Sequence, residues 1–148
     1  MKSVTFIVVI VLSFMTSLLL AEDSKNTISE KEFFQVFSGT WVNEEYIGVT
    51  YQRQKLINYS DGRWEEYNFI TDDQSDHYGK YTMDDIWVGS NGDIWCKARR
   101  ECLVHGKYYL FGKISKSGTV LEYVFQESRY PTEISPIEGH YNIRYRQE

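Results

Sequence analysis

The fold of this chain is constrained most by a run of short segments in which aromatic or aliphatic residues alternate with polar ones. Turn residues separate the segments, as at Asp61-Gly62 and in the cluster 89–93. Successive side chains of a strand point to opposite faces, so this alternation predicts strands with one buried face. The expected strands cover residues 41–46, 51–59, 63–70, 79–88, 94–99, 102–115, 119–126 and 139–146.

The number of segments and the shortness of most turns set the architecture. The sequence predicts an all-β fold, an up-and-down antiparallel barrel of about eight strands with a short N-terminal helix. A tightly packed sandwich is the alternative. At this strand number the interior of a barrel is either filled by side chains or wide enough for one small ligand.

A short helix is predicted just before the first strand. Ser29 and Glu32 match a capping box, in which the side chain of each residue binds the backbone N–H of the other. Phe33, Val36 and Phe37 then fall on one helical face. We expect this helix to cover one end of the barrel.

The N-terminus has the pattern of a secretory signal peptide. Lys2 precedes an almost uncharged apolar run, 4–20, and Ala21 ends it with a small residue. An uncleaved membrane anchor is the alternative. The predicted mature protein is secreted or periplasmic, with no membrane attachment after cleavage. The expected division is a signal peptide at 1–21, a leader and capping helix at 22–37, and a barrel domain at 38–148.

Gly39 and Trp41 suit the floor of such a barrel. Because Gly39 has no Cβ, it lets the backbone approach the floor closely, and Trp41 is large enough to plug it. Asn43 shares the inward face of Trp41. Its buried amide would need a neighbouring group, a water molecule or a ligand as a hydrogen-bond partner.

These residues carry a resemblance to known small barrels. Phe37-x-Gly39-x-Trp41, preceded by a short helix, resembles the signature of the lipocalins in the calycin superfamily. Gly39-Thr40-Trp41-Val42-Asn43 is equally similar to the opening strand of the avidins. Resemblance to lipocalins implies a hydrophobic ligand in the lumen, and resemblance to avidins implies a polar head group held by the inward Asn43.

The resemblance also implies a partner for Trp41 in the last strand. Lipocalins commonly place an arginine of that strand over the tryptophan, in a cation–π contact that seals the floor. Arg144 or Arg146 would fill this role here. The alternative is that both arginines face solvent.

The first functional expectation is an exported protein that holds a small, partly hydrophobic or amphipathic molecule in its lumen. No cofactor is expected. The predicted ligand-binding side chains are aromatic or amide groups at strand positions, and plain core packing is the alternative role for each. They are Trp41, Asn43, Tyr67, Phe69, Tyr81, Trp95, Tyr123 and Tyr141.

The second functional expectation is a protein-binding module, such as a secreted or periplasmic inhibitor of a hydrolase. Small barrels of this kind use loops instead of the lumen. The candidate contact segments are the leader 22–28, the acidic segment 71–77 and the polar segment 97–101. A basic target would suit the net charge of −5.

Cys96 and Cys102 are the only cysteines of the chain. In an exported protein, two nearby cysteines are more often paired than not. If residues 97–101 form a hairpin tip, the two thiols lie opposite each other, and the sequence predicts a disulfide. Two independent thiols are the alternative.

The sequence gives no support for an enzyme, a metal site or a nucleic-acid partner. It has no nucleophile elbow, phosphate-binding loop, dinucleotide fingerprint or zinc-protease motif. His77, His105 and His140 belong to different predicted segments, and acidic pairs such as Glu65-Glu66 point to opposite faces of a strand. An acidic chain without a basic stripe argues against nucleic acid.

Overall fold

The computed structural model describes residues 26–47, 50–68 and 72–148. The predicted signal peptide, 1–21, lies outside the described residues, and so does Phe69. Within these ranges, no helix is both long and apolar enough to cross a membrane.

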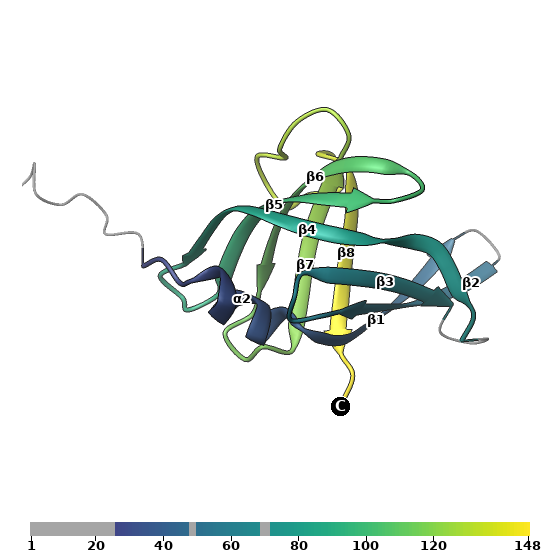
Figure 1. Ribbon diagram of the computed structural model, residues 1–148, viewed down its shortest axis with the longest axis horizontal. Coiled ribbons are helices and arrows are strands. Elements are labelled where there is room, and N and C mark those ends of the chain that lie inside the picture. The colour runs from purple at the N-terminus through teal and green to yellow at the C-terminus, as the bar shows by residue number, and fades with distance from the viewer. Residues whose placement is uncertain (1–25, 48–49, 69–71) are drawn as a thin grey trace, which may run out of the picture.

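The strands form one closed antiparallel barrel in which each strand pairs with its neighbours in sequence (Figure 1). The ring closes where β1 pairs with β8, with Trp41 opposite Arg146 and Val42 opposite Tyr145. The predicted all-β barrel is confirmed, as is the Asp61-Gly62 turn, and the sandwich alternative is wrong. After helix α2, Glu30–Phe37, the strands are β1 Gly39–Ile47, β2 Thr50–Asn58, β3 Arg63–Asn68, β4 Gln74–Val88, β5 Ile94–Cys102, β6 Gly106–Ile114, β7 Val120–Gln126 and β8 His140–Arg146.

Two segments predicted as loops belong at least partly to strands. The acidic segment 71–77 is expected at the barrel rim, but β4 already begins at Gln74. The predicted hairpin tip 97–101 lies inside β5, and the turn follows at residues 103–105. The outer face of a strand presents polar residues to water, so its sequence has the polarity of a loop. Residues 97–101, one of the three segments proposed to contact a protein partner, are therefore part of a strand and not a loop.

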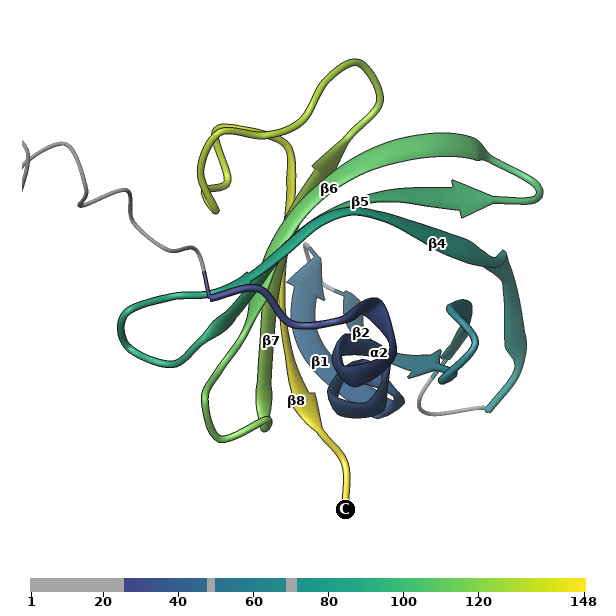
Figure 2. The same cartoon turned by 60° about the vertical axis from the view of Figure 1, so that its left-hand side comes forward.

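Helix α2 lies across one end of the barrel (Figure 2). The predicted capping box is present, because the backbone N–H of Ser29 donates to Glu32 Oε2 at 2.9 Å and that of Glu32 donates to Ser29 Oγ at 3.2 Å. The apolar face of the helix turns into the barrel. Its buried aromatic residues, which pack ring against ring, are Phe33, Phe34 and Phe37.

Trp41 plugs the barrel beneath this helix. It is fully buried, and its indole Nε1 donates to the carbonyl oxygen of Phe37 at 2.9 Å. The guanidinium carbon of Arg146 lies 4.4 Å from the centre of the indole ring, and the same group donates to the carbonyl oxygen of Val36 in the last turn of α2. Arg146 therefore makes the predicted cation–π contact. The solvent-facing alternative is wrong, since Arg144 is buried as well.

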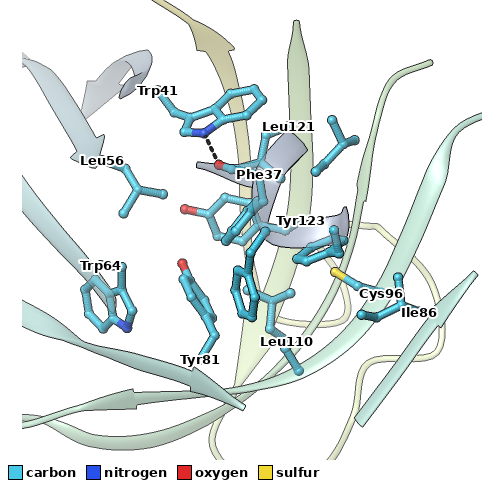
Figure 3. Close-up of a cluster of buried hydrophobic side chains, with 14 of the residues drawn as sticks. Phe37, Trp41, Leu56, Trp64, Tyr81, Ile86, Cys96, Leu110, Leu121 and Tyr123 are labelled. Carbon is cyan, nitrogen blue, oxygen red and sulfur yellow. Dashed lines mark hydrogen bonds between the residues drawn. The ribbon is translucent and has the colours of Figure 1, made fainter. Parts of the chain in front are cut away.

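Apolar side chains fill the half of the barrel next to α2 (Figure 3). They come from almost every strand, so the core holds the ring of strands together from inside. Its apolar surface contributes about 25 cal/mol for each Å² removed from water. Among its members are Trp41, Leu56, Tyr81, Ile86, Cys96, Leu110, Ile114 and Leu121.

Gly39→Ala should destabilise the protein by ~1–3 kcal/mol, because Gly39 has a φ of 126° and an added Cβ would lie 2.7 Å from Nη1 of Arg146. Urea denaturation measures the loss. Gly106→Ala is the matched control: its φ is 95°, but an added Cβ meets no atom of the described residues within 4 Å. A smaller loss at Gly106 is expected, and equal losses would contradict the close approach of Arg146.

Candidate functional site

A cavity of about 580 Å³ occupies the other half of the barrel. Its lining residues lie at the ends of the strands away from α2 and in the connection between β7 and β8. The aromatic side chains Trp64, Tyr108 and Phe125 form part of the wall. The remaining lining residues include polar and charged groups, so the interior changes along the barrel from a packed apolar core to an open polar chamber.

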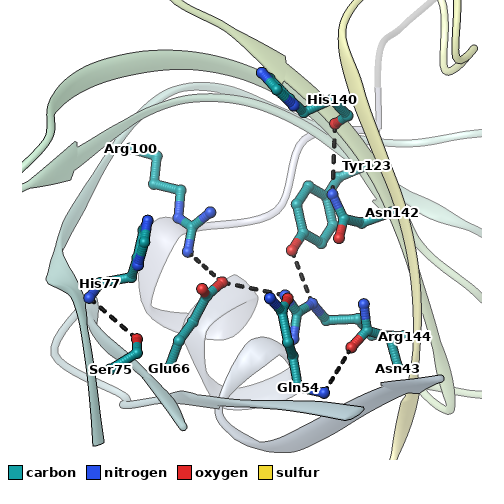
Figure 4. Close-up of polar contacts among 10 residues, drawn as sticks. All are labelled: Asn43, Gln54, Glu66, Ser75, His77, Arg100, Tyr123, His140, Asn142 and Arg144. Carbon is teal, nitrogen blue, oxygen red and sulfur yellow. Dashed lines mark hydrogen bonds and ion pairs between the residues drawn. The ribbon is translucent and has the colours of Figure 1, made fainter. Parts of the chain in front are cut away.

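Three buried charged residues from different strands form the floor of this cavity (Figure 4). Arg100 Nη2 donates to Glu66 Oε1 at 2.7 Å, and Arg144 Nη2 donates to the same oxygen at 3.1 Å. The exposed fractions are 8% for Glu66, 4% for Arg100 and 1% for Arg144. We call these three residues the Arg–Glu–Arg cluster.

Neighbouring side chains fix both guanidinium groups in place. Arg144 Nε donates to the hydroxyl of Tyr123 at 2.8 Å, and its Nη2 also reaches Gln54 Oε1 at 3.3 Å. The guanidinium carbon of Arg100 lies 3.7 Å from the ring centre of Trp64. Stacking and hydrogen bonding together hold the two cations at defined positions in the chamber.

The cluster keeps Glu66 ionised. Burial by itself would raise the pKa of Glu66, but the charges of Arg100 and Arg144 and the hydrogen bond from Arg100 outweigh it. The pKa of this carboxyl group therefore lies below its ordinary value. The cluster accordingly carries two positive charges and one negative charge.

Several buried donors at this site have no hydrogen-bond partner among the described residues. They include Nε of Arg100, Nη1 of Arg144 and Nδ2 of Asn43. Asn43 uses its carbonyl oxygen, which accepts the backbone N–H of Gln54 at 3.2 Å. Buried donors of this kind are costly unless water or a ligand binds them.

Four of the predicted ligand-binding residues do point into the barrel. Trp41 and Tyr81 belong to the packed apolar half. Asn43 is 1% exposed and lies near the cluster, and Tyr123 binds Arg144 through its hydroxyl (Figure 4). The inward direction predicted for Asn43 is confirmed, and Phe69 cannot be placed because it lies outside the described residues.

Three others turn their side chains to the outer face, although Tyr141 still contributes to the lining of the cavity. The ring of Trp95 is 6.2 Å from that of Trp87, Tyr67 donates to Glu65 at 2.7 Å, and Tyr141 donates to Glu122 at 2.8 Å. Their neighbours in sequence take the inward positions instead. The physical reason is that Glu66, Arg100 and Arg144 point inward on the same three strands. Because side chains alternate along a strand, the three aromatic residues then fall on the outer face.

The Arg–Glu–Arg cluster is not predicted from the sequence, because its three residues lie on different strands and Arg144 is considered only as a partner of Trp41 or as a solvent-facing residue. A signal for Arg100 was present in β5. Cys96, Ala98 and Cys102 are buried on one face of that strand, and Arg100 falls on the same alternation. An arginine that shares one face of a strand with small buried residues is expected to point into the barrel.

The predicted disulfide is wrong, because Cys96 and Cys102 are not bonded. Both lie on β5, and six residues of strand separate their Cα atoms by about 20 Å, since a strand rises ~3.3 Å per residue. A disulfide needs Cα atoms within about 7 Å. Burial raises the pKa of the Cys96 thiol to about 12, so it stays protonated at neutral pH.

The three histidines gather at the open end of the barrel. The rings of His77 and His105 stack with centres 4.2 Å apart, and His140 stacks on Phe125 at 5.2 Å. His77 and His140 also line the cavity. Within the described ranges, no group of three or more histidine, cysteine, aspartate or glutamate residues has an arrangement that could hold a metal ion.

Comparisons with known proteins add no family to this picture. No protein-family model, curated protein or solved structure matches this chain. The barrel is compatible with a lipocalin-like fold, and its function has to be inferred from the site itself.

Glu66→Gln should lower the free energy of unfolding by ~3–5 kcal/mol at neutral pH, because it leaves two buried guanidinium groups without a counter-charge. The ionised carboxylate stabilises the folded protein above its ordinary pKa of 4.5, and this stabilisation is lost as the pH falls through the lowered folded-state pKa. The difference between wild type and variant in urea denaturation should therefore narrow below about pH 4.5.

The matched control for this measurement is Glu65→Gln, on the opposite face of β3. It should lower the free energy of unfolding by about 1 kcal/mol or less, because the amide oxygen can still accept from Tyr67 and the buried cluster stays intact. A gap between wild type and Glu66→Gln that stays constant down to about pH 3 would contradict the ionised, charge-paired state of Glu66.

Proposed function

We propose that this protein binds a small, partly hydrophobic molecule in the open half of its barrel. The observation that carries the proposal is the cavity of about 580 Å³ above the Arg–Glu–Arg cluster. Cavities of roughly 300–1,000 Å³ are typical of small-molecule sites. Aromatic walls supply apolar contact area, and a few fixed polar groups supply orientation.

The closed end of the barrel supports a lipocalin-like assignment. It combines the short helix, Gly39-x-Trp41 and an arginine of the last strand over the indole ring. In this arrangement α2 and Trp41 seal one end, so a ligand enters from the other. The apolar N-terminal run 4–20 supports export of the protein to a secreted or periplasmic location.

A protein-binding role is the second proposal, and one surface feature favours it. The turn between β5 and β6 exposes Leu103 by 75% and Val104 by 53%. Exposed apolar side chains can mark a contact surface. However, this turn adjoins Cys102, which lines the cavity. Leu103 itself lines a separate, smaller pocket of about 220 Å³ with Tyr78 and Lys80. The larger open chamber therefore favours small-molecule binding as the main role.

Asn142→Trp should weaken binding of the neutral fluorescent probe N-phenyl-1-naphthylamine by about tenfold or more, because Asn142 lines the cavity and an indole would fill it. Ile143→Trp adds the same indole on the outer face of β8 and should leave the affinity within about twofold. Fluorescence titration gives both dissociation constants. Absence of probe binding to the wild type, or equal effects of the two variants, would contradict a ligand site in the chamber.

A further inference from the structure

We propose that the molecule held in this cavity is an amphipathic monoanion, and that its carboxylate binds between Arg100 and Arg144. This inference rests on the proposed function, because it specifies the chemistry of the ligand for that site. It identifies the Arg–Glu–Arg cluster as the subsite for the charged group.

The charge balance of the cluster leaves room for one negative charge. Two guanidinium groups face one carboxylate, and all three side chains are at least nine-tenths buried. A buried charge without a counter-charge is strongly unfavourable. One added carboxylate would neutralise the cluster, whereas a neutral ligand would leave the excess positive charge in place.

The hydrogen-bonding pattern supports the same ligand chemistry. Oε1 of Glu66 accepts from both arginines. Arg100 Nε and Arg144 Nη1 nevertheless remain buried without a partner among the described residues. A carboxylate has two acceptor oxygens, and its hydrogen bonds with guanidinium groups are strong because both partners are charged. The cluster therefore offers donors suited to an anion.

Other charged or titratable side chains also surround the cluster (Figure 4). His77 helps to lower the pKa of Glu66 through its charge, and the hydroxyl of Tyr123 accepts from Arg144. Glu127 lines the cavity but is exposed, so solvent screens its charge. His140 lines the cavity as well, and Gln54 and Asn142 are neutral. Among the side chains that the structure describes, the buried floor therefore has a net positive charge, even though the whole chain has a formal charge of −5.

The apolar part of the ligand would lie along the chamber wall. Trp64 and Phe125 flank Arg100, with the guanidinium carbon 3.7 and 5.3 Å from their ring centres. Tyr108 extends this aromatic wall, and Phe125 packs edge-on against it at 5.4 Å. An entering molecule would thus place its carboxylate at the floor and its apolar chain toward the mouth.

The test compares three competitors that share one alkyl chain and differ in head group: decanoate, decanamide and decylammonium. Each displaces N-phenyl-1-naphthylamine from the wild-type protein at neutral pH and low salt, below the micelle-forming concentration of each competitor. Decanoate should bind about tenfold more tightly than decanamide, since hydrogen bonds to a charged group are stronger than those to a neutral one. Decylammonium should be the weakest competitor.

Arg144→Met should remove most of the roughly tenfold advantage of decanoate over decanamide, because one of the two guanidinium groups that would bind the carboxylate is lost. Arg99→Gln, on the outer face of β5 where Arg99 pairs with Asp84 at 3.0 Å, should keep the wild-type preference. Circular dichroism checks that both variants fold. If Arg144→Met does not fold, the wild-type comparison of decanoate with decanamide still decides the proposal.

The outcomes separate this inference from the proposed function. If N-phenyl-1-naphthylamine itself does not bind, the proposed function fails and the ligand class fails with it. If the probe binds but decanoate and decanamide displace it equally, or decylammonium displaces it best, only the anionic ligand is overturned. A preference for decanoate that survives in Arg144→Met would overturn the assignment of the carboxylate to this arginine.

Discussion

The contact of Arg146 with Trp41 and the end of α2 is the interaction on which the barrel depends most. It joins the last strand to the first strand and to the helix, and it places a cation where the carbonyl groups of the last helical turn need a donor. The indole of Trp41 also donates a hydrogen bond to the carbonyl oxygen of Phe37, the last residue of α2. Sheet closure, helix position and the seal of the floor therefore depend on one small group of side chains.

This seal allows the two halves of the interior to differ. The half beside α2 is packed with apolar side chains and supplies the free energy that holds the ring together. The open half contains buried charges and unpartnered donors, which reduce stability. Proteins commonly accept such a local cost at binding sites, where the missing partner arrives with the ligand.

The sequence predicted the barrel, the capping box, the floor tryptophan and the inward Asn43, because local alternation and turn chemistry encode these features. The prediction of inward and outward side chains failed where polar residues are buried and aromatic residues lie on the outer face. Arg100 and Arg144 are more polar than Trp95 and Tyr141, yet they point inward while these aromatic residues point outward. The pairing of Glu66 with both arginines explains that reversal. The alternation in β5 contains a local signal for Arg100, but the pairing joins three strands that are far apart in sequence. The polar segment 97–101 was likewise predicted as a hairpin tip but belongs to β5. The two cysteines therefore do not face each other across a turn, and the predicted disulfide does not form.

The pairing of β1 with β8 also has a consequence for the order in which the protein can assemble. Val42 and Tyr145 are neighbours in the sheet although almost the whole domain separates them in sequence. Contacts of such long range form slowly, since the chain loses the entropy of closing a large loop before the strand pairing contributes any stability. During synthesis the growing chain has two open sheet edges until its last strand appears. The barrel can close only after β8 has been synthesised, and its edges stay available for wrong pairing with other chains until then.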